Sequence, residues 1–216
     1  MKHSRCEMLF GGDFLAYRHA KILLLGVGGV GSFCLDCLYR SGVTDITIVD
    51  FDRFDESNQN RQIGSDAVGE IKVAVLAERY PGVIPVELKI TPEWVEEFDF
   101  GPYDLVLDAI DDFRSKIAVI KKCHKKLISS MGSAKKLDPT KIEVRSLWKT
   151  EGDKFASKIR TQLKKERFSK QVTVICSTEH AGCREKGSFV GVTGAFGLAM
   201  CSQAIRTLIK NNKDTQ

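Results

Sequence analysis

The sequence lacks a regular cysteine framework. Its seven cysteines are an odd number without a repeated spacing, and we expect no signal peptide, no disulfides and a reducing, cytoplasmic setting. Cys34 and Cys37 form a single C-x-x-C pair, whereas a structural zinc site needs a second pair. We therefore interpret these two cysteines as small residues that pack one face of a helix against a sheet.

A strong excess of one charge is also missing, since 33 Lys+Arg against 28 Asp+Glu leave a net charge of +5. The hydrophobic share of 43% and the charged share of 28% exclude a disordered or fibrous chain. A length of 216 residues predicts one domain. The basic residues gather at 121–126 and 149–170, and such clusters either bind a polyanion or form a solvated helix face.

No apolar run is both long and uninterrupted. The segment 187–210 approaches the length of a membrane span, but polar residues such as Thr193, Gln203 and Arg206 interrupt it. We predict a buried helix or a helix at a dimer contact, without membrane contact. A frayed tail is expected at 211–216.

A βαβ unit opens the folded part of the chain. The apolar run at 22–25 predicts a buried strand that leads directly into a glycine-rich loop, followed by a helix to Arg40 and a strand at 45–49. Further elements alternate after it, and their order predicts an α/β fold with a doubly wound, Rossmann-like, mostly parallel sheet. Helices are expected on both faces, with a C-terminal strand and helix extension. Beyond the first unit we predict helices at 66–79, 115–126 and 153–165, and strands at 83–90, 105–107, 127–130, 142–144 and 172–176.

This order divides the single domain into four parts. Residues 1–20 are expected to form an N-terminal arm and residues 21–133 a nucleotide-binding core. Residues 134–210 would form an extension for substrate or dimer contacts, before the tail at 211–216.

Gly26, Gly28 and Gly31 satisfy G-x-G-x-x-G between a strand and a helix, so that backbone amides can approach phosphates closely. Asp50 lies 19 residues after Gly31, at the end of the second strand, where a carboxylate can hold the hydroxyls of a ribose. These features fit NAD and ATP equally.

The charged residues that follow favour ATP. Asn58 and Arg61 are one helical turn apart and can point at one ligand, and Lys72 adds a second cation. Asp111 follows a short apolar strand and can hold Mg²⁺ against the phosphates. Each residue alone also fits a helix cap, a surface ion pair or a solvated side chain, but the complete set behind this loop points to a triphosphate.

These motifs resemble the ThiF/MoeB/HesA family of adenylating enzymes, which are related to ubiquitin-activating enzymes, over residues 4–145. The resemblance implies a role for Gly29 near the phosphates and for Asp50 on the ribose, with Asp52 in the same nucleotide-binding set. It also places Asn58, Arg61 and Lys72 on the triphosphate and Asp111 on Mg²⁺. The matching segments are Gly26–Gly31, Val49–Asp52, Asn58–Gln62, Gly69 with Lys72, and Asp108–Asp111.

The segment Ser4–Gly11 is similar to the N-terminal segment of the family, whose arginine reaches into the ATP site of a partner subunit. Arg5 occupies the matching position. The resemblance therefore implies a homodimer in which Arg5 acts in trans.

Several segments of the second half carry a further resemblance: Gly132–Ala134, Leu137–Ile142, Leu147–Thr150, Ser177–Glu179 and, more weakly, Gly187–Phe189. They resemble the branch of the family that dehydrates threonylcarbamoyladenosine beside the anticodon of tRNA, except that the stretch between Glu179 and Gly187 is shorter here. That branch adenylates a carboxylate with ATP and closes a ring, without needing a cysteine relay. The basic helix would then contact the phosphate backbone of tRNA rather than its bases. Its candidate contacts are Lys158, Arg160, Lys164 and Lys165.

Three other functions share parts of this sequence pattern. One is adenylation of the C-terminal glycine of a ubiquitin-like sulfur carrier, with Cys176 or Cys183 as the candidate relay and a sulfur carrier or cysteine desulfurase as partner. The absence of paired C-x-x-C motifs and the basic helix argue against it. A non-catalytic nucleotide-binding scaffold does not need the full set of charges. An NAD-dependent oxidoreductase would need an acid–base pair for hydride transfer, and no such pair follows Asp111.

Overall fold

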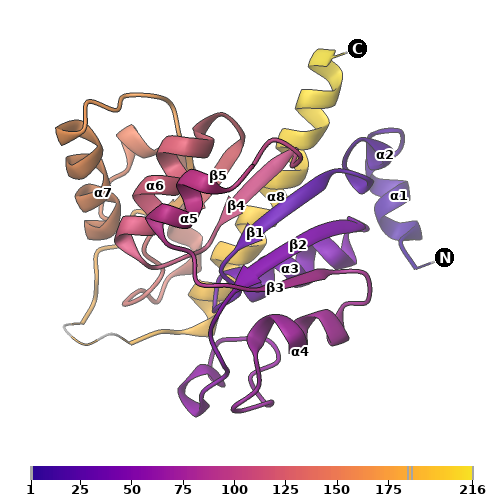
Figure 1. Cartoon of the computed structure of the whole chain (residues 1–216), viewed down its shortest axis with the longest axis horizontal. Helices are drawn as coiled ribbons and strands as arrows, with labels where there is room; N and C mark the ends of the chain where they lie inside the picture. Colours follow the sequence, from indigo (N-terminus) through magenta and orange to yellow (C-terminus); the bar gives the residue numbers. More distant parts are fainter. Residues whose placement is uncertain (1, 184, 186, 216) are drawn as a thin grey trace.

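The computed structural model describes residues 2–183, 185 and 187–215. Parts of the predicted arm, shortened loop and tail at residues 1, 184, 186 and 216 lie outside the described residues. The described residues form one seven-stranded sheet in the order β3-β2-β1-β4-β5-β7-β6, in which β6 alone runs antiparallel to its neighbour (Figure 1). The strands are β1 (Lys21–Leu25), β2 (Asp45–Asp50), β3 (Ile84–Glu87), β4 (Leu105–Asp108), β5 (Leu127–Ser130), β6 (Ile142–Ser146) and β7 (Thr173–Ser177).

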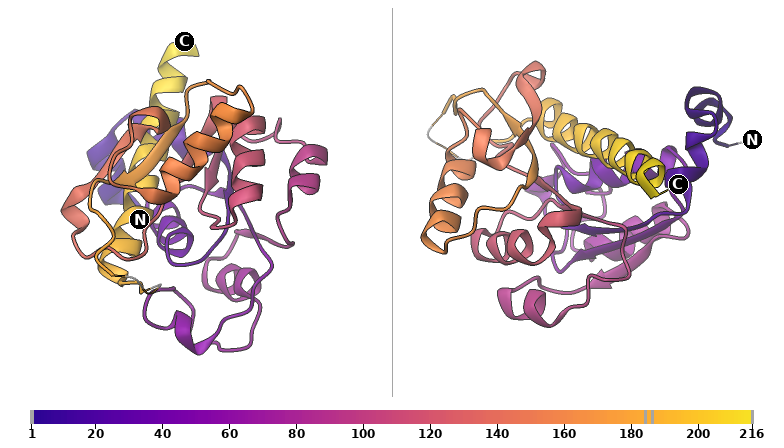
Figure 2. Two further views of the ribbon diagram at one scale, coloured as in Figure 1. Left: turned by 90° about the vertical axis from the view of Figure 1, so that its left-hand side faces the viewer. Right: turned by 90° about the horizontal axis from the view of Figure 1, so that it is seen from above.

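Helices cover both faces of this sheet, as the sequence predicts for a doubly wound fold (Figure 2). The helices α2, α3, α4 and α8 pack on one face and α5, α6 and α7 on the other. The predicted α/β, Rossmann-like fold class is therefore confirmed. The helices are α1 (Ser4–Phe10), α2 (Asp13–Arg18), α3 (Gly31–Arg40), α4 (Lys72–Arg79), α5 (Pro92–Glu97), α6 (Phe113–Cys123), α7 (Lys154–Lys165) and α8 (Val190–Thr215), with 3-10 turns η1 (Glu56–Asn58), η2 (His124–Lys126), η3 (Pro139–Lys141) and η4 (Leu147–Lys149).

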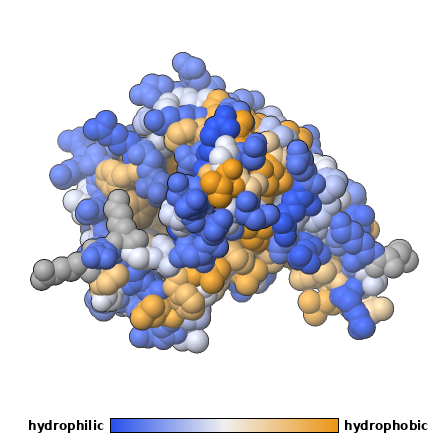
Figure 3. Space-filling model, turned by 90° about the horizontal axis from the view of Figure 1, so that it is seen from below, coloured by the Kyte–Doolittle hydropathy of each residue, from blue (hydrophilic) through white to orange (hydrophobic). Residues whose placement is uncertain are grey.

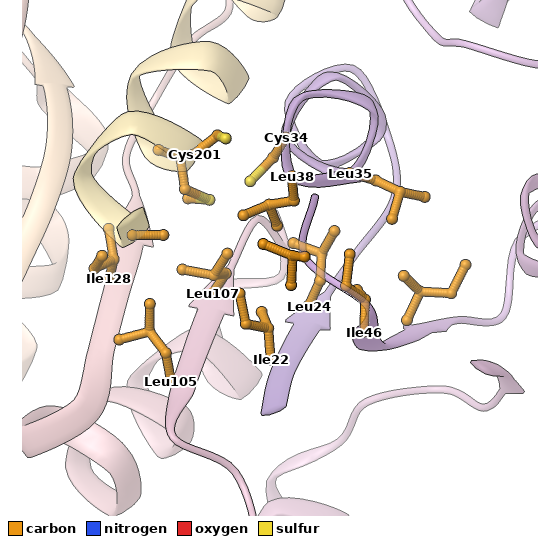
Figure 4. Close-up of a cluster of buried hydrophobic side chains, with 14 of the residues drawn as sticks. Ile22, Leu24, Cys34, Leu35, Leu38, Ile46, Leu105, Leu107, Ile128 and Cys201 are labelled. Atoms are coloured by element: carbon orange, nitrogen blue, oxygen red, sulfur yellow. The ribbon is translucent and has the colours of Figure 1, made fainter. Parts of the chain in front are cut away.

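The central strand β1 divides its side chains between two cores. Ile22 and Leu24 point to the face covered by α3 and α8, and Leu23 points to the face covered by α5, α6 and α7. Successive side chains of a strand alternate between its two faces. A strand that is buried on both sides therefore reads as a continuous apolar run in the sequence. Figure 4 shows the first of these cores, with Cys34 of α3 and Cys201 of α8 facing each other above the strands.

Helix α8 owes its interleaved glycines to a close crossing with α3. A Cβ atom at position 197 would overlap with the carbonyl oxygen of Val30, and one at position 194 would lie 3.2 Å from the Phe33 ring. The described residues contain one helix, Val190–Asp214, that is apolar and long enough to cross a membrane, and 56% of its most apolar window is buried inside the protein. We therefore interpret α8 as a core helix.

Both ends of the chain contain more helix than the sequence predicts. Residues 4–18 form α1 and α2, and α8 continues to Thr215, so the predicted frayed tail is wrong for residues 211–215. The last turns of α8 are held by an ion pair of 2.9 Å between Lys213 Nζ and Asp13 Oδ2 of α2. This contact joins the two ends of the chain, which no local sequence pattern shows.

The helix predicted at 66–79 begins only at Lys72. Gly69 has a φ of +88°, which ends any helical path, and Ile71 is extended and forms an isolated antiparallel bridge with Arg53. Tertiary pairing overrides local helix propensity here. The displaced start places Lys72 in the first turn of α4, at the carboxyl-end edge of the sheet.

Candidate nucleotide-binding site

The order of strands reverses between β1 and β4, because β1 to β3 extend the sheet in one direction and β4, β5 and β7 in the other. Leu25, the last residue of β1, pairs with Val49 of β2 and Asp108 of β4. Ligands of open α/β sheets bind outside the carboxyl ends of the strands at such a switch point. All the predicted nucleotide-binding motifs lie at this edge.

The glycine loop turns sharply between β1 and α3. Gly26 has a φ of +84°, and a Cβ atom there would lie 3.0 Å from the carbonyl oxygen of Ala109. A Cβ atom at position 31 would overlap with the carbonyl oxygen of Gly26. Glycine is required at both positions, since any larger residue would force the turn apart. The loop thus directs the N-terminus of α3 at a ligand and touches the segment that leads to Asp111.

Asp50 fixes the start of this loop. Its Oδ2 accepts a hydrogen bond of 2.8 Å from the Val27 amide, and its Oδ1 accepts one of 2.9 Å from the Asp52 amide. Each carboxylate oxygen can accept a further bond. Asp50 can therefore hold ribose hydroxyls while it holds the loop.

Lys72 and Asp52 form an ion pair of 3.1 Å beside the loop. The Lys72 side chain is 6% exposed and that of Asp52 is 48% exposed. Within the described chain, Asp52 is the one hydrogen-bond partner of the Lys72 ammonium, which carries three N–H donors. The lysine is therefore held in place and keeps donors for phosphate oxygens.

Arg61 lies against the tip of the glycine loop. A Cβ atom at position 29 would lie 3.3 Å from Arg61 Cγ and 3.4 Å from Thr193 Cβ. The Arg61 guanidinium donates to the Ser57 carbonyl oxygen at 2.6 Å and to Asn60 Oδ1 at 2.8 Å. These bonds fix the side chain at the loop, where it can pair with a triphosphate.

Asn58 has a more structural role than the sequence predicts. It is buried, and its Oδ1 accepts the Asp55 amide at 3.3 Å while the Asp55 side chain accepts the Ser57 amide, which together form a capping box. Asn58 therefore shapes η1, the turn that presents Arg61. Whether its side-chain amide also reaches the nucleotide stays a prediction.

Sequence reasoning missed Gln62, although the residue stands in the motif that carries Asn58 and Arg61. Its Oε1 is a buried atom without a hydrogen-bond partner in the described chain, and its Nε2 lies 3.8 Å from the place of a Cβ atom at Gly28. Buried polar atoms are nearly always paired. An unpaired one at the glycine loop fits a cradle that binds a polar ligand. The same segment is tied to residues before α8, since Asn60 Nδ2 donates to the Ser188 carbonyl oxygen at 3.0 Å.

Asp111 lies in the loop between β4 and α6, and its side chain is exposed. The next residue, Asp112, caps α6 through a bond of 2.8 Å from the Ser115 amide, and this bond lowers the pKa of the Asp112 carboxyl. Among the described residues no three His, Cys, Asp or Glu side chains form a metal cage. A single free carboxylate beside a triphosphate nevertheless fits Mg²⁺, which binds through one or two carboxylates plus substrate phosphates.

A buried ion pair between α6 and the end of β4 supports this loop, and no sequence motif predicted it. The Lys116 ammonium lies 2.7 Å from Asp108 Oδ2, and both side chains are fully buried. Asp108 also accepts bonds from Ser129 Oγ at 2.6 Å and from the Ile110 amide at 3.1 Å. Burial lowers the pKa of the Lys116 ammonium, and the Asp108 carboxylate opposes this effect. Asp108 thus joins β4, β5 and α6.

Arg5 does not reach the site of its own chain. It is exposed on α1, and that segment is held to the far end of α3, where His3 Nδ1 lies 3.1 Å from the Arg40 carbonyl oxygen. The glycine loop joins the opposite end of α3, at Gly31. A ten-residue helix is about 15 Å long. The structure therefore separates Arg5 from the other predicted catalytic residues.

The predicted basic helix exists as α7, but its cations differ in their surroundings. Lys158, Lys164 and Lys165 are exposed. Arg160 instead turns inward and donates to the Thr150 carbonyl oxygen at 2.9 Å and to the Thr150 hydroxyl. The prediction of Arg160 as a tRNA contact is corrected accordingly, because its guanidinium braces η4 against α7.

The two cysteines considered for a relay also differ. Cys176 is buried in β7, and burial raises the pKa of its thiol to about 11. Cys183 is exposed in the loop before α8. Glu179 anchors the start of this loop through bonds from the Leu137 and Asp138 amides, which lower the pKa of its carboxyl.

The fold and these side chains define an α/β nucleotide-binding protein whose glycine loop, lysine and arginine are placed for a phosphate chain. Residues 8–216 match the ThiF family, and the chain belongs to this family. The adenylating family predicted from the motifs is thereby confirmed.

Within this family, the chain is similar to several dehydratases that act on tRNA. The chain is 41% identical over 189 residues to the tRNA threonylcarbamoyladenosine dehydratase of Bacillus subtilis, covering 82% of this chain and 74% of the relative. It is 31% identical to the enzyme of that name from Haemophilus influenzae, with 94% of each chain covered. That alignment spans 246 positions, more than the 216 residues of this chain, so the relative contains insertions that are absent here. The crystal structure of the E. coli tRNA N6-threonylcarbamoyladenosine dehydratase in complex with ATP superimposes with a TM-score of 0.94 at 32% identity, covering 100% of this chain and 96% of that one.

Proposed function

We propose that this protein uses ATP to adenylate the carboxylate of threonylcarbamoyladenosine in tRNA and converts it to the cyclic form with net loss of water. The observation that carries this proposal is the buried Lys72 beside the glycine loop, with Arg61 at the loop tip. The similarity to dehydratases of this name, one of them in complex with ATP, supports the choice of substrate.

The chemistry needs positioning rather than a strong base. A carboxylate is already ionised at neutral pH and can attack the α-phosphorus of ATP while pyrophosphate leaves. A nucleophile of the same side chain then attacks the activated carbonyl, and AMP leaves with the original carboxylate oxygen. The tethered nucleophile has a high effective concentration, so no cysteine relay is required.

The chain supplies the groups for the first step. Lys72 and Arg61 would neutralise the phosphates and the leaving pyrophosphate, and the loop amides would hold the phosphate chain. Asp50 would hold the ribose. Asp111 would hold Mg²⁺ against the phosphates, where the ion would offset the charge that develops on the leaving group.

The sulfur-carrier alternative has less support. Cys176 is buried with a raised thiol pKa, so it is a poor nucleophile. The described residues form no metal cage of the kind that paired C-x-x-C motifs would build. A sulfur carrier or a cysteine desulfurase as a partner stays a prediction, which a pull-down with each purified protein would test.

One experiment separates the two functions. The protein is incubated with ATP, Mg²⁺ and bulk tRNA that carries threonylcarbamoyladenosine, and the digested nucleosides are examined by mass spectrometry. We expect a nucleoside lighter by one water, formed only with ATP. Pyrophosphate release that requires an added β-grasp protein, with the tRNA unchanged, would instead support the sulfur-carrier function.

A homodimer with Arg5 acting in trans fits the position of α1. The exposed apolar side chains Met8, Leu9 and Leu15 lie on α1 and α2, and Figure 3 shows apolar surface near this end of the molecule. A subunit interface would bury these side chains. ATP and tRNA are both cytoplasmic, and we propose the cytoplasm as the location of the dimer.

Mixing two inactive variants tests the trans arrangement. Arg5→Ala and Lys72→Ala proteins should each be inactive. A mixture that has exchanged subunits should regain about a quarter of the total activity of the same amount of wild-type protein. Half of the dimers would be mixed, and each mixed dimer would have one complete site. No recovery, although subunit exchange is demonstrated by differently tagged chains, would show that Arg5 does not act in trans.

A further inference from the structure

A surface groove runs between α6 and α7, beside α5. It consists of two neighbouring cavities of about 650 and 450 Å³, which share Phe113 and Gln162 in their linings. Figure 2 shows α5, α6 and α7 side by side on this face of the sheet. We call this feature the α6/α7 groove.

The groove begins at the edge of the sheet where the nucleotide site lies. Phe113, the first residue of α6, is two positions after Asp111. Asp153 caps α7 and also accepts a bond of 3.0 Å from the Gly132 amide, just after β5. Both helices therefore start at the carboxyl ends of the strands. The half-buried rings of Phe113 and Phe155 pack edge to face there, with centroids 6.4 Å apart and an interplanar angle of 66°.

Cations follow the groove away from that edge. Lys158 and Lys165 line the second cavity, three and ten positions after Phe155 on one face of α7. Ten residues of helix extend about 15 Å. Both lysines are exposed, and within the described chain their ammonium groups have no hydrogen-bond or ion-pair partner.

The acidic groups of the groove do not cancel these charges. Glu166 accepts bonds from Lys121 at 2.6 Å and from Gln162 at 2.7 Å. Glu96 lies 3.8 Å from the Lys122 ammonium. Each carboxylate is thus matched by its own lysine, and Lys158 and Lys165 remain available for an anion.

We propose that the α6/α7 groove binds the single-stranded anticodon loop of the tRNA substrate, an inference that rests on the proposed function. Proteins recognise RNA loops by stacking unpaired bases on aromatic rings and by pairing lysines with phosphates. The groove offers a ring pair next to Asp111 and two free cations farther out. In this arrangement the modified nucleotide of the tRNA lies at the ATP site, and the adjacent nucleotides of the tRNA lie along α7. An acidic protein could also pair with the two lysines, but it has no unpaired bases to stack on the Phe113 and Phe155 rings.

The test compares charge reversals on one helix. In Lys158→Glu/Lys165→Glu, we expect the KM for tRNA to rise about tenfold or more, with kcat little changed and a shallower dependence of binding on salt. Lys154→Glu is the matched control, because Lys154 is an exposed lysine of the same helix that lines neither cavity. Its KM should change less than about twofold. Phe155→Leu keeps an apolar side chain and removes the ring, so it should weaken binding of an anticodon stem-loop oligonucleotide.

Two readouts separate this inference from the proposed function. ATP affinity, measured without tRNA, should be equal in all variants. If the wild-type protein does not dehydrate tRNA, the proposed function fails. If it does, and the double variant keeps the wild-type KM or responds no more than Lys154→Glu, the groove is not the site of the anticodon loop.

Discussion

Replacement of Lys72 by alanine is expected to reduce ATP–pyrophosphate exchange, measured with modified tRNA present, by at least about a hundredfold. The lysine is nearly fully buried, is held by Asp52, and stands beside the loop that would carry the phosphates. Removal of one preorganised donor to a developing charge costs about 10²- to 10³-fold in other enzymes. Asp111→Ala should cause a comparable loss, and excess Mg²⁺ should not restore full exchange because no other carboxylate of the loop is free.

Arg79→Ala is the control for this experiment, because it removes a cation from the opposite, exposed end of the same helix α4. It should exchange pyrophosphate at the wild-type rate. Thermal unfolding of all variants would separate a catalytic loss from a folding defect. Exchange at the wild-type rate by Lys72→Ala or Asp111→Ala would contradict the assignment of that residue.

Lys116→Met is expected to lower the free energy of unfolding by about 3–5 kcal/mol, because it leaves the Asp108 carboxylate buried without its cation. The two groups are fully buried at 2.7 Å, so water cannot replace the ammonium. Denaturant unfolding followed by circular dichroism would measure the change. Since Asp108 also accepts the Ile110 amide, the loop that carries Asp111 should become less ordered.

The double variant Asp108→Asn/Lys116→Met distinguishes the charge effect from a packing effect. It removes both charges and should be more stable than the sum of the two single variants predicts. Strict additivity, or a Lys116→Met protein as stable as the wild type, would show that the pair does not stabilise the loop.

The sequence predicted those parts of the site that depend on local geometry. The turn at Gly26 and Gly31 follows from residue spacing, and Asp50 follows from the end of a strand, so both were found. The Lys116–Asp108 pair was missed because its partners come from different elements and share no motif. Similarly, spacing alone could not show that Arg160 turns inward.

The same distinction holds for the fold. Alternation of helices and strands predicted the sheet and its two covered faces, because each element buries its own apolar side. The late start of α4 coincides with a bridge between Ile71 and Arg53, and the last turns of α8 contact α2 through the Lys213–Asp13 pair. Such long-range contacts do not appear in a window of neighbouring residues.

The packing of α8 also sets an order of events during synthesis. Strand β1 and helix α3 are made early, but α8, which covers them, follows only after the other strands and helices of the sheet. Chains are synthesised from the N-terminus at about 5–20 residues per second. The apolar face of this βαβ unit therefore stays uncovered until α8 has been made, so the glycine loop gains its final support only after all the strands of the sheet have been synthesised.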